Sequence, residues 1–309
     1  MPDSFRTNAS FVNVSIALWE PNEEIRKIIV ATMRESNFLG LSVCHSLVEL
    51  SDTLAEGTLD VIILAVDKEL EHICRIVRAI RGNEIGNNPF LILMALVTAP
   101  DPALIRKVLG SGFDDVLVKP LSANTLIERM TRFATARKPF VITSDYIGPD
   151  RRDTPRRDGN QPVTFNAPNP IRIRIEGGSA SAIFQSTLDH GAAMLNTHKM
   201  ERNGEAMLAL SQSIFTLLSD ESDIPALAKA RLELEKLIHV AEDVQRRTRH
   251  GSHAHLSKLG DALHNLATTL RAAFNASPSE IKLNFEDVRL LPQIAAGVAK
   301  AIRLGNKKS

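Results

Sequence analysis

The chain has 309 residues, which is enough for two domains of ordinary size. Its 37 Lys and Arg residues nearly balance its 36 Asp and Glu residues, so its net charge gives no general attraction to nucleic acid or anionic membranes. The two cysteines are too few for a disulfide framework or a Cys-rich zinc site. No apolar run approaches the roughly 20 residues of a membrane span, and no signal peptide is evident. We therefore expect a cytoplasmic protein.

Residues 12–136 alternate strand-forming and helix-forming runs, and three successive apolar residues such as Ile62–Leu64 are typical of strands covered by helices on both faces. The pattern predicts a doubly wound α/β domain, a flavodoxin-like five-stranded parallel sheet. The predicted strands are Val14–Trp19, Leu41–Cys44, Val61–Val66, Phe90–Val97 and Asp115–Val118, and the predicted helices are Glu23–Ser36, Leu47–Glu56, Glu69–Arg81, Ala103–Gly110 and Asn124–Ala136.

Residues 137–178 are predicted to form an Arg- and Pro-rich linker, because residues 137 to about 170 have no hydrophobic period. Within it, Ile171–Ile175 alternates isoleucine with arginine and predicts a short strand or an extended segment. Paired guanidinium groups suit phosphates and purine faces, so a cyclic dinucleotide is one candidate ligand of this segment. The alternative, which we favour, is a solvated linker with neutralising Arg–Asp pairs. The candidate ligand-binding residues are Arg151, Arg152, Arg156 and Arg157.

Residues 179–305 have only helical periodicity, with helices predicted at Ala182–Leu195, Glu205–Leu218 and about Phe285–Arg303 and two leucine-rich stripes between them. A four- or five-helix bundle is favoured, and the alternative is a helical hairpin that completes its core by forming a homodimer. His250, His253 and His255 could belong to a metal site or a phosphotransfer site, but a solvated helix start is the favoured interpretation. With one Trp and one Tyr in the chain, base stacking has little support, and we expect no nucleic-acid binding.

Polar residues follow four of the predicted strands. Glu20 follows the first strand, Asp67 the third, Thr98 the fourth and Lys119 the fifth. Because the carboxyl ends of parallel strands meet at one edge of a sheet, we expect these side chains to converge. Acid, hydroxyl and ammonium groups together suit a phosphoryl group beside a cation.

The same 12–136 region resembles the CheY-like receiver domain of two-component response regulators. The resemblance is carried by the segments IALWEPNEEIRKII, LDVIILAVD and LVTAPDPALIRKVLGSGFDDVLVKPLSANTLIERM. It implies an aspartate after the third strand that accepts a phosphoryl group from a histidine kinase, an acidic pair that holds Mg²⁺, and a hydroxyl and a lysine that bind the phosphate. Thr98 and Lys119 match the last two, and Glu20 matches one acid of the pair. The helical region resembles no family.

Two positions depart from this pattern. Ala65 stands at the phosphoacceptor position and Pro21 at the second acid, so the resemblance implies a degenerate pseudo-receiver with no cofactor and no catalytic activity. Such a protein would signal by docking to a histidine kinase or a downstream target, with the helical region for output or dimerisation. One alternative is a response regulator phosphorylated on Asp67, with Mg²⁺ held by Glu20 and Asp67; a salt bridge from Asp67 to Lys119 is the simpler role. The other alternative is an effector controlled by a cyclic dinucleotide through the arginine-rich linker.

Overall fold

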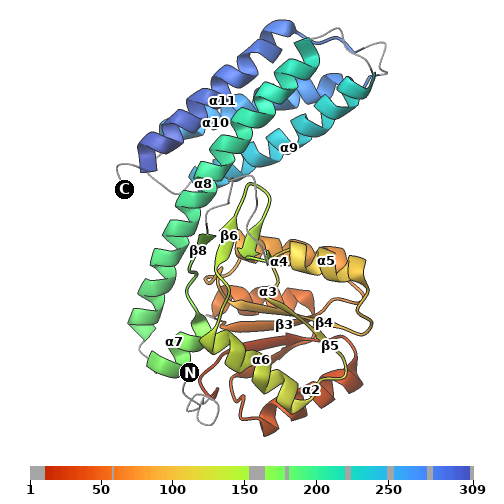
Figure 1. Cartoon of the computed structure of the whole chain (residues 1–309), viewed down its shortest axis with the longest axis vertical. Helices are drawn as coiled ribbons and strands as arrows, with labels where there is room; N and C mark the ends of the chain where they lie inside the picture. Colours follow the sequence, from red (N-terminus) through yellow and green to blue (C-terminus); the bar gives the residue numbers. More distant parts are fainter. Residues whose placement is uncertain are drawn as a thin grey trace. The chain divides into compact units, whose positions relative to one another are not determined.

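The computed structural model describes residues 11–57, 59–152, 164–177, 181–219, 224–248, 254–276 and 281–306. The chain divides into two compact units, which we call the α/β unit (Met1–Ala193) and the helical unit (Met194–Ser309). Figure 1 shows the elements of both units.

The α/β unit contains a five-stranded parallel sheet with the strand order β2-β1-β3-β4-β5. Its register places Leu18 opposite Val43 on one side and Ile63 on the other. This order and the alternating helices confirm the predicted doubly wound fold. The strands are β1 (Ile16–Trp19), β2 (Leu41–Cys44), β3 (Val61–Ala65), β4 (Ile92–Val97) and β5 (Asp115–Val118).

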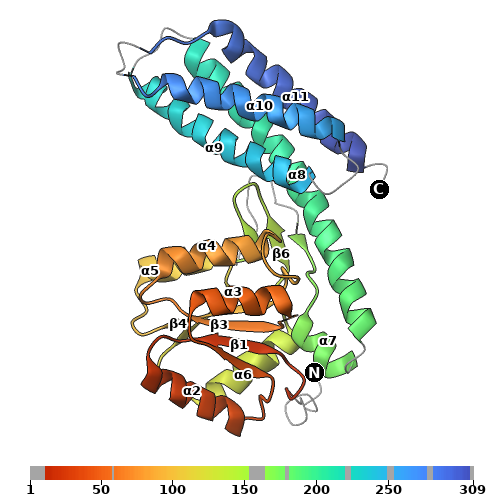
Figure 2. The same cartoon turned by 180° about the vertical axis from the view of Figure 1, so that it is seen from behind.

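Helices cover both faces of this sheet. In both views, α3, α4 and α5 lie on one face and α2 and α6 on the other (Figures 1 and 2). The helices are α2 (Glu23–Glu35), α3 (Leu47–Glu56), α4 (Leu70–Arg81), α5 (Pro102–Gly110) and α6 (Ala123–Thr135). Every residue of β3 and β4 is buried, which explains why these strands are apolar in succession.

Local sequence sets where several of these helices begin. The Asn22 side chain accepts hydrogen bonds from the first free N–H groups of α2. Asp101 does the same for α5, and Pro102 follows it at a position where a missing N–H costs little.

The segment predicted as a linker contains regular structure within the α/β unit. Antiparallel strands form a second sheet with the order β7-β6-β8: β6 (Phe140–Ile142), β7 (Ile147–Pro149) and β8 (Thr164–Phe165). The Phe90, Phe140 and Phe165 rings pack together with centroids 5.9–6.1 Å apart, which supplies this sheet with an apolar core.

The extended segment predicted from the isoleucine alternation is wrong, because these residues form α7 (Pro170–Gly177). The Asn169 side chain accepts a hydrogen bond from the Arg172 N–H at 3.2 Å, and Arg172 also pairs with Glu176 one turn later. Ile171 is fully buried in the core of the α/β unit. These helix-specific interactions outweigh the strand-like alternation.

The helical unit is all-α, as predicted, and its helices share one apolar core. Its elements are α8 (Ser181–Ser219), within which the boundary between the units falls, α9 (Ile224–Thr248), α10 (Ala254–Ala273) and α11 (Phe285–Asn306). The two separate helices predicted at 182–195 and 205–218 are wrong, because α8 runs through both. The polar residues between them include Asn203, which is buried and donates to Asp243 of α9 at 2.7 Å. No helix in the described ranges is long and apolar enough to cross a membrane.

Candidate functional site

Four residues predicted to converge are brought together at the carboxyl edge of the main sheet. Glu20, Thr98 and Lys119 directly follow β1, β4 and β5, and Asp67 follows β3 by two residues. Because β1, β3, β4 and β5 are neighbours in the sheet, the chain delivers the four side chains to one place. The peptide bond that follows, Lys119–Pro120, is cis.

The Lys119 ammonium lies between two carboxylates. Its Nζ is 2.9 Å from Oε2 of Glu20 and 2.7 Å from Oδ2 of Asp67. The Lys119 and Glu20 side chains are 7% and 2% exposed, whereas the Asp67 side chain is 29% exposed. The Asp67–Lys119 salt bridge suggested by the sequence is therefore present, and Glu20 completes it on the buried side.

Asp67 also accepts two hydrogen bonds from Thr98. The Thr98 backbone N–H donates to Oδ1 at 2.9 Å, and the Thr98 hydroxyl donates to Oδ2 at 3.0 Å. One carboxylate thus receives an N–H, an O–H and an ammonium. These are the kinds of donor that stabilise an oxyanion.

The electrostatics of the site favour its charged forms. Partial burial acts to raise the pKa of Asp67, but the hydrogen bonds from Lys119 and Thr98 outweigh burial and hold the pKa below its ordinary value. Burial acts to lower the pKa of Lys119, but its hydrogen bonds to Asp67 and Glu20 outweigh burial and raise the pKa. At neutral pH the site therefore holds an ammonium ion against an ionised Asp67.

The end of β3 explains why Asp67 is free to make these contacts. Ala65 is the last residue of β3 and is 2% exposed, and its methyl group offers no oxygen for phosphorylation. The Val66 N–H still donates to the Leu96 carbonyl at 3.0 Å, so sheet-like pairing continues for one more residue. Asp67 comes after this last bond, and its side chain bonds to the loop that follows β4.

The residues present do not fit a Mg²⁺ site of the receiver type. Magnesium requires near-octahedral oxygen ligands, but Glu20 Oε2 and Asp67 Oδ2 both bond to Lys119, and Glu20 Oε1 accepts the Asn22 N–H at 2.9 Å. Pro21 adds no side-chain oxygen. In the described part of the chain, no group of three or more His, Cys, Asp or Glu residues could hold a metal ion.

Of the four arginines predicted to bind a ligand, the structure describes two, Arg151 and Arg152. Arg151 donates from its Nη1 to the Asp114 carbonyl at 3.0 Å and from its Nη2 to the Phe113 carbonyl. The Arg152 Nε lies 2.8 Å from Oδ1 of Asp150. Both side chains thus bond within the α/β unit. Arg156 and Arg157 lie outside the described residues, as do His250 and His253.

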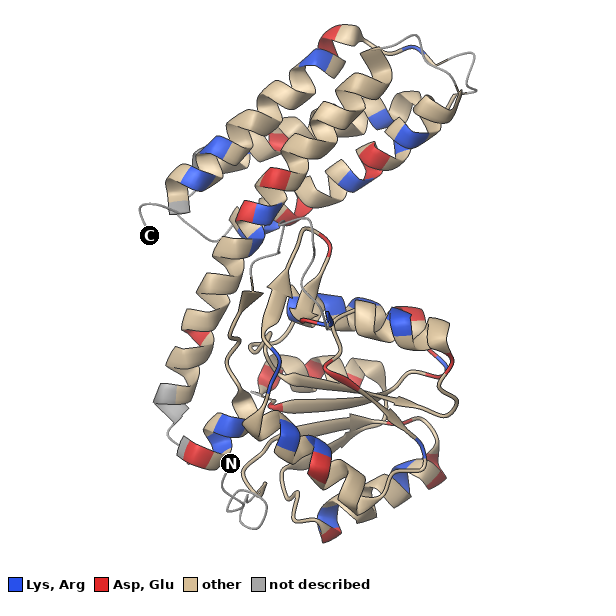
Figure 3. Ribbon diagram, in the orientation of Figure 1, with Lys and Arg blue, Asp and Glu red and all other residues tan. Residues whose placement is uncertain are grey.

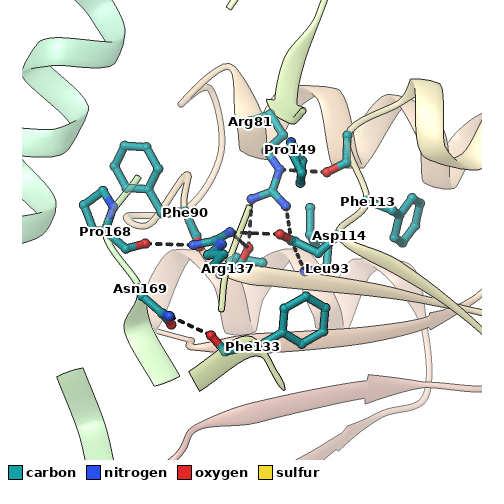
Figure 4. A network of polar contacts seen from close by, with 12 residues as sticks. Arg81, Phe90, Leu93, Phe113, Asp114, Phe133, Arg137, Pro149, Pro168 and Asn169 are labelled. Carbon is teal, nitrogen blue, oxygen red and sulfur yellow. Dashed lines mark hydrogen bonds and ion pairs between the residues drawn. The ribbon is translucent and has the colours of Figure 1, made fainter. Parts of the chain in front are cut away.

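Sequence reasoning missed a buried charge network at the opposite edge of the sheet (Figure 4). Asp114, just before β5, accepts hydrogen bonds from Arg81 at the end of α4 and, at 3.1 Å, from Arg137. Its carboxylate also accepts the Leu93 N–H at 2.9 Å. The network links α4, β4 and β5 to the segment that leads into the second sheet. The only signal in the sequence is the Asp114–Asp115 pair, which does not reveal the partners.

A second ion pair that the sequence did not predict connects α7 to the main sheet. The Arg174 Nε lies 3.2 and 3.0 Å from the two carboxylate oxygens of Asp60, which also accepts the Ser15 N–H at 2.8 Å. Burial raises the pKa of Asp60 to about 6, although these bonds partly oppose it. The Arg174 guanidinium lies 4.2 Å from the Phe184 ring centroid, which adds a cation–π contact.

The sequence matches no protein-family model and no curated protein. Among solved structures, the chain is similar to a response regulator from Thermotoga maritima, with 18% identity and a TM-score of 0.35 over 39% of this chain and 96% of that chain. It is similar to the chemotaxis protein CheY4 from Vibrio cholerae, with 20% identity and a TM-score of 0.34 over 38% of this chain and 97% of that chain. The response regulator DrrB from Thermotoga maritima is 22% identical, with a TM-score of 0.31 over 39% of this chain and 52% of that chain. At these identities the similarities concern the fold alone.

Proposed function

We propose that this chain is an atypical response regulator whose α/β unit signals by binding another protein, without aspartyl phosphorylation and without catalytic turnover. The observation that carries the proposal is the Asp67 carboxylate, which accepts hydrogen bonds from Lys119 and from both donors of Thr98. An internal carboxylate therefore occupies the donors that a phosphoryl group would need.

Two further features support this proposal. Ala65 ends β3 with a methyl group. Glu20 is buried and bonded to Lys119 and Asn22, so it is not available to complete a magnesium site. In Asp67, the remaining carboxylate, Oδ1 accepts one hydrogen bond and Oδ2 accepts two, so phosphorylation of either oxygen competes with at least one bond already made. The partners in this proposal are signalling proteins, a histidine kinase or a downstream target, and the helical unit serves for output.

The proposal is tested by incubating the full chain with Mg²⁺ and acetyl phosphate and measuring its intact mass. We expect no phosphoryl adduct on the wild type or on Asp67→Asn, while a conventional receiver domain in the same reaction is labelled. The variant is a matched control because it keeps the shape of the Asp67 side chain and removes only its charge. An adduct that forms on the wild type and is absent from Asp67→Asn would instead establish phosphorylation of Asp67.

A further inference from the structure

One face of the α/β unit carries two stripes of opposite charge on neighbouring helices. Along α3, the exposed side chains Glu49, Asp52 and Glu56 recur at helical spacing, and α3 contains no Lys, Arg or His. Val48, at the start of the same helix, is 70% exposed. The outward face of α3 is therefore acidic with an exposed apolar residue at one end.

The neighbouring helix α4 carries the opposite charge. Its exposed residues Arg75 and Arg78 are three positions apart, and His72 lies three positions before Arg75. Figure 3 marks the Lys and Arg positions of the helices in blue and the Asp and Glu positions in red. Two acidic residues, Glu69 and Glu71, lie near this stripe, but they pair with His72 and with Lys107 of α5 respectively. The outward face of α4 therefore carries the positive charges of Arg75 and Arg78, and Glu69 lies at its N-terminal end.

The two stripes lie on helices that cover the same face of the sheet, and no ion pair joins them in the described part of the chain. Both helices cover the same face of the sheet in Figures 1 and 2, and the backbone of Gly86, just after α4, approaches the Leu54 side chain of α3. Within the described ranges, Asp52, Glu56, Arg75 and Arg78 form no ion pair. The charges point away from the sheet, and their counter-charges must come from solvent ions or from another molecule.

We propose that this face binds a second copy of the chain. A two-fold axis that runs parallel to α3 and α4, between them, places α3 of each copy over α4 of the other. At a rise of about 1.5 Å per residue, Asp52 and Glu56 lie about 6 Å apart along α3 and Arg75 and Arg78 about 4.5 Å apart along α4, so the two acidic residues of one copy can face the two arginines of the other. The alternative axis, across the helices, would place like charges together and is disfavoured.

The chemistry of the face also sets the kind of dimer expected. Each exposed ion pair contributes little to the free energy of binding, so several charge pairs and the apolar Val48 side chain must act together. Because salt screens exposed charges, the affinity of the dimer should depend on the salt concentration. The dimer should form at about 20 mM salt and weaken at about 500 mM salt, because the Debye length falls from roughly 20 Å to about 4 Å between these two concentrations. This inference does not depend on whether Asp67 accepts a phosphoryl group.

Two charge-reversal variants test the proposal by sedimentation equilibrium of the full chain. The variant Asp52→Lys/Glu56→Lys makes both stripes basic, and Arg75→Glu/Arg78→Glu makes both acidic. We expect each variant alone to raise the dimer dissociation constant by about tenfold or more, because like charges then oppose each other across the axis. An equimolar mixture of the two should recover dimers, since each stripe again meets its opposite.

A matched control changes two charges on the other face of the sheet. Lys27→Glu/Arg34→Glu alters two exposed cations of α2 and should leave the dissociation constant unchanged. The proposal is overturned if the wild-type chain is monomeric at low salt, or if its dimer resists both reversals and so forms through another surface. Failure of the mixture to recover dimers, when each variant alone is monomeric, also overturns it.

Discussion

Replacing Asp114 by Asn should strongly destabilise the α/β unit. The Asp114 and Arg81 side chains are each 1% exposed, and the Arg137 side chain is 5% exposed. Burial acts to raise the pKa of Asp114, but Arg137 and Arg81 outweigh it and hold the pKa below its ordinary value. The substitution removes the only carboxylate that either guanidinium contacts within the described ranges. Two buried cations would then repel each other, with backbone carbonyls but no carboxylate to compensate their charge.

The size of the effect follows from these contacts. Removing one partner of a buried ion pair costs about 3–5 kcal/mol, and we expect about 3 kcal/mol because the amide oxygen of the substituted side chain could still accept a hydrogen bond, for example from the Leu93 N–H. With a dependence of about 2 kcal/mol per molar urea, the unfolding midpoint should fall by about 1.5 M. Trp19 is the single tryptophan, and it is buried in β1, so its fluorescence follows the α/β unit specifically.

The neighbouring residue supplies the control. Asp115 pairs with Arg129 at 3.1 Å, and these side chains are 22% and 36% exposed. Asp115→Asn should therefore cost less than about 1 kcal/mol. If the two substitutions shift the Trp19 transition equally, the buried network does not hold the unit together and the reasoning fails.

Three other measurements check separate parts of the structure. Lys119→Met leaves the buried Glu20 carboxylate without its cation and should destabilise the α/β unit by about 2–3 kcal/mol, measured by Trp19 fluorescence in urea. Asp60 has a pKa of about 6 when folded and about 3.9 when unfolded. Since the folded state binds the proton more tightly, the free energy of unfolding should fall as pH rises between these values, by at most about 3 kcal/mol relative to Asp60→Asn. Leu263→Ala, in the core of the helical unit, should cost about 2–5 kcal/mol, seen as an earlier loss of far-UV circular dichroism in urea.

The parts of the fold that could be predicted depend on local pattern. The predicted helix Leu47–Glu56 coincides with α3, because its apolar spacing and the Ser46 cap are both local signals. Likewise, the convergence of Glu20, Thr98 and Lys119 follows from their place after parallel strands, before any side-chain contact is known.

The parts that could not be predicted depend on contacts between distant residues. Arg174 bonds to Asp60, which is 114 positions earlier in the chain, and this contact holds a segment whose alternation favours a strand. Arg137 similarly belongs to a segment without hydrophobic period, yet its guanidinium bonds to the Phe90 and Pro168 carbonyls and to Asp114. Arginines are usually exposed, and a single sequence contains no pattern that pairs one of them with a buried acceptor many positions away in the chain.

At the carboxyl edge of the sheet, Asp67 supplies the second negative charge beside Lys119 that Ala65 cannot provide. Lys119 is buried against Glu20, and a second negative group beside it strengthens its charged form. Asp67 supplies that group from two residues further along the chain and gains both Thr98 donors. In the structure these bonds connect the end of β3 to the loop after β4 without any added group, whereas a phosphoryl group would connect them only while it is attached. If the α/β unit acts as proposed, without phosphorylation, these bonds would hold the loops after β3 and β4 in one conformation, and such preorganisation lowers the cost of binding a partner.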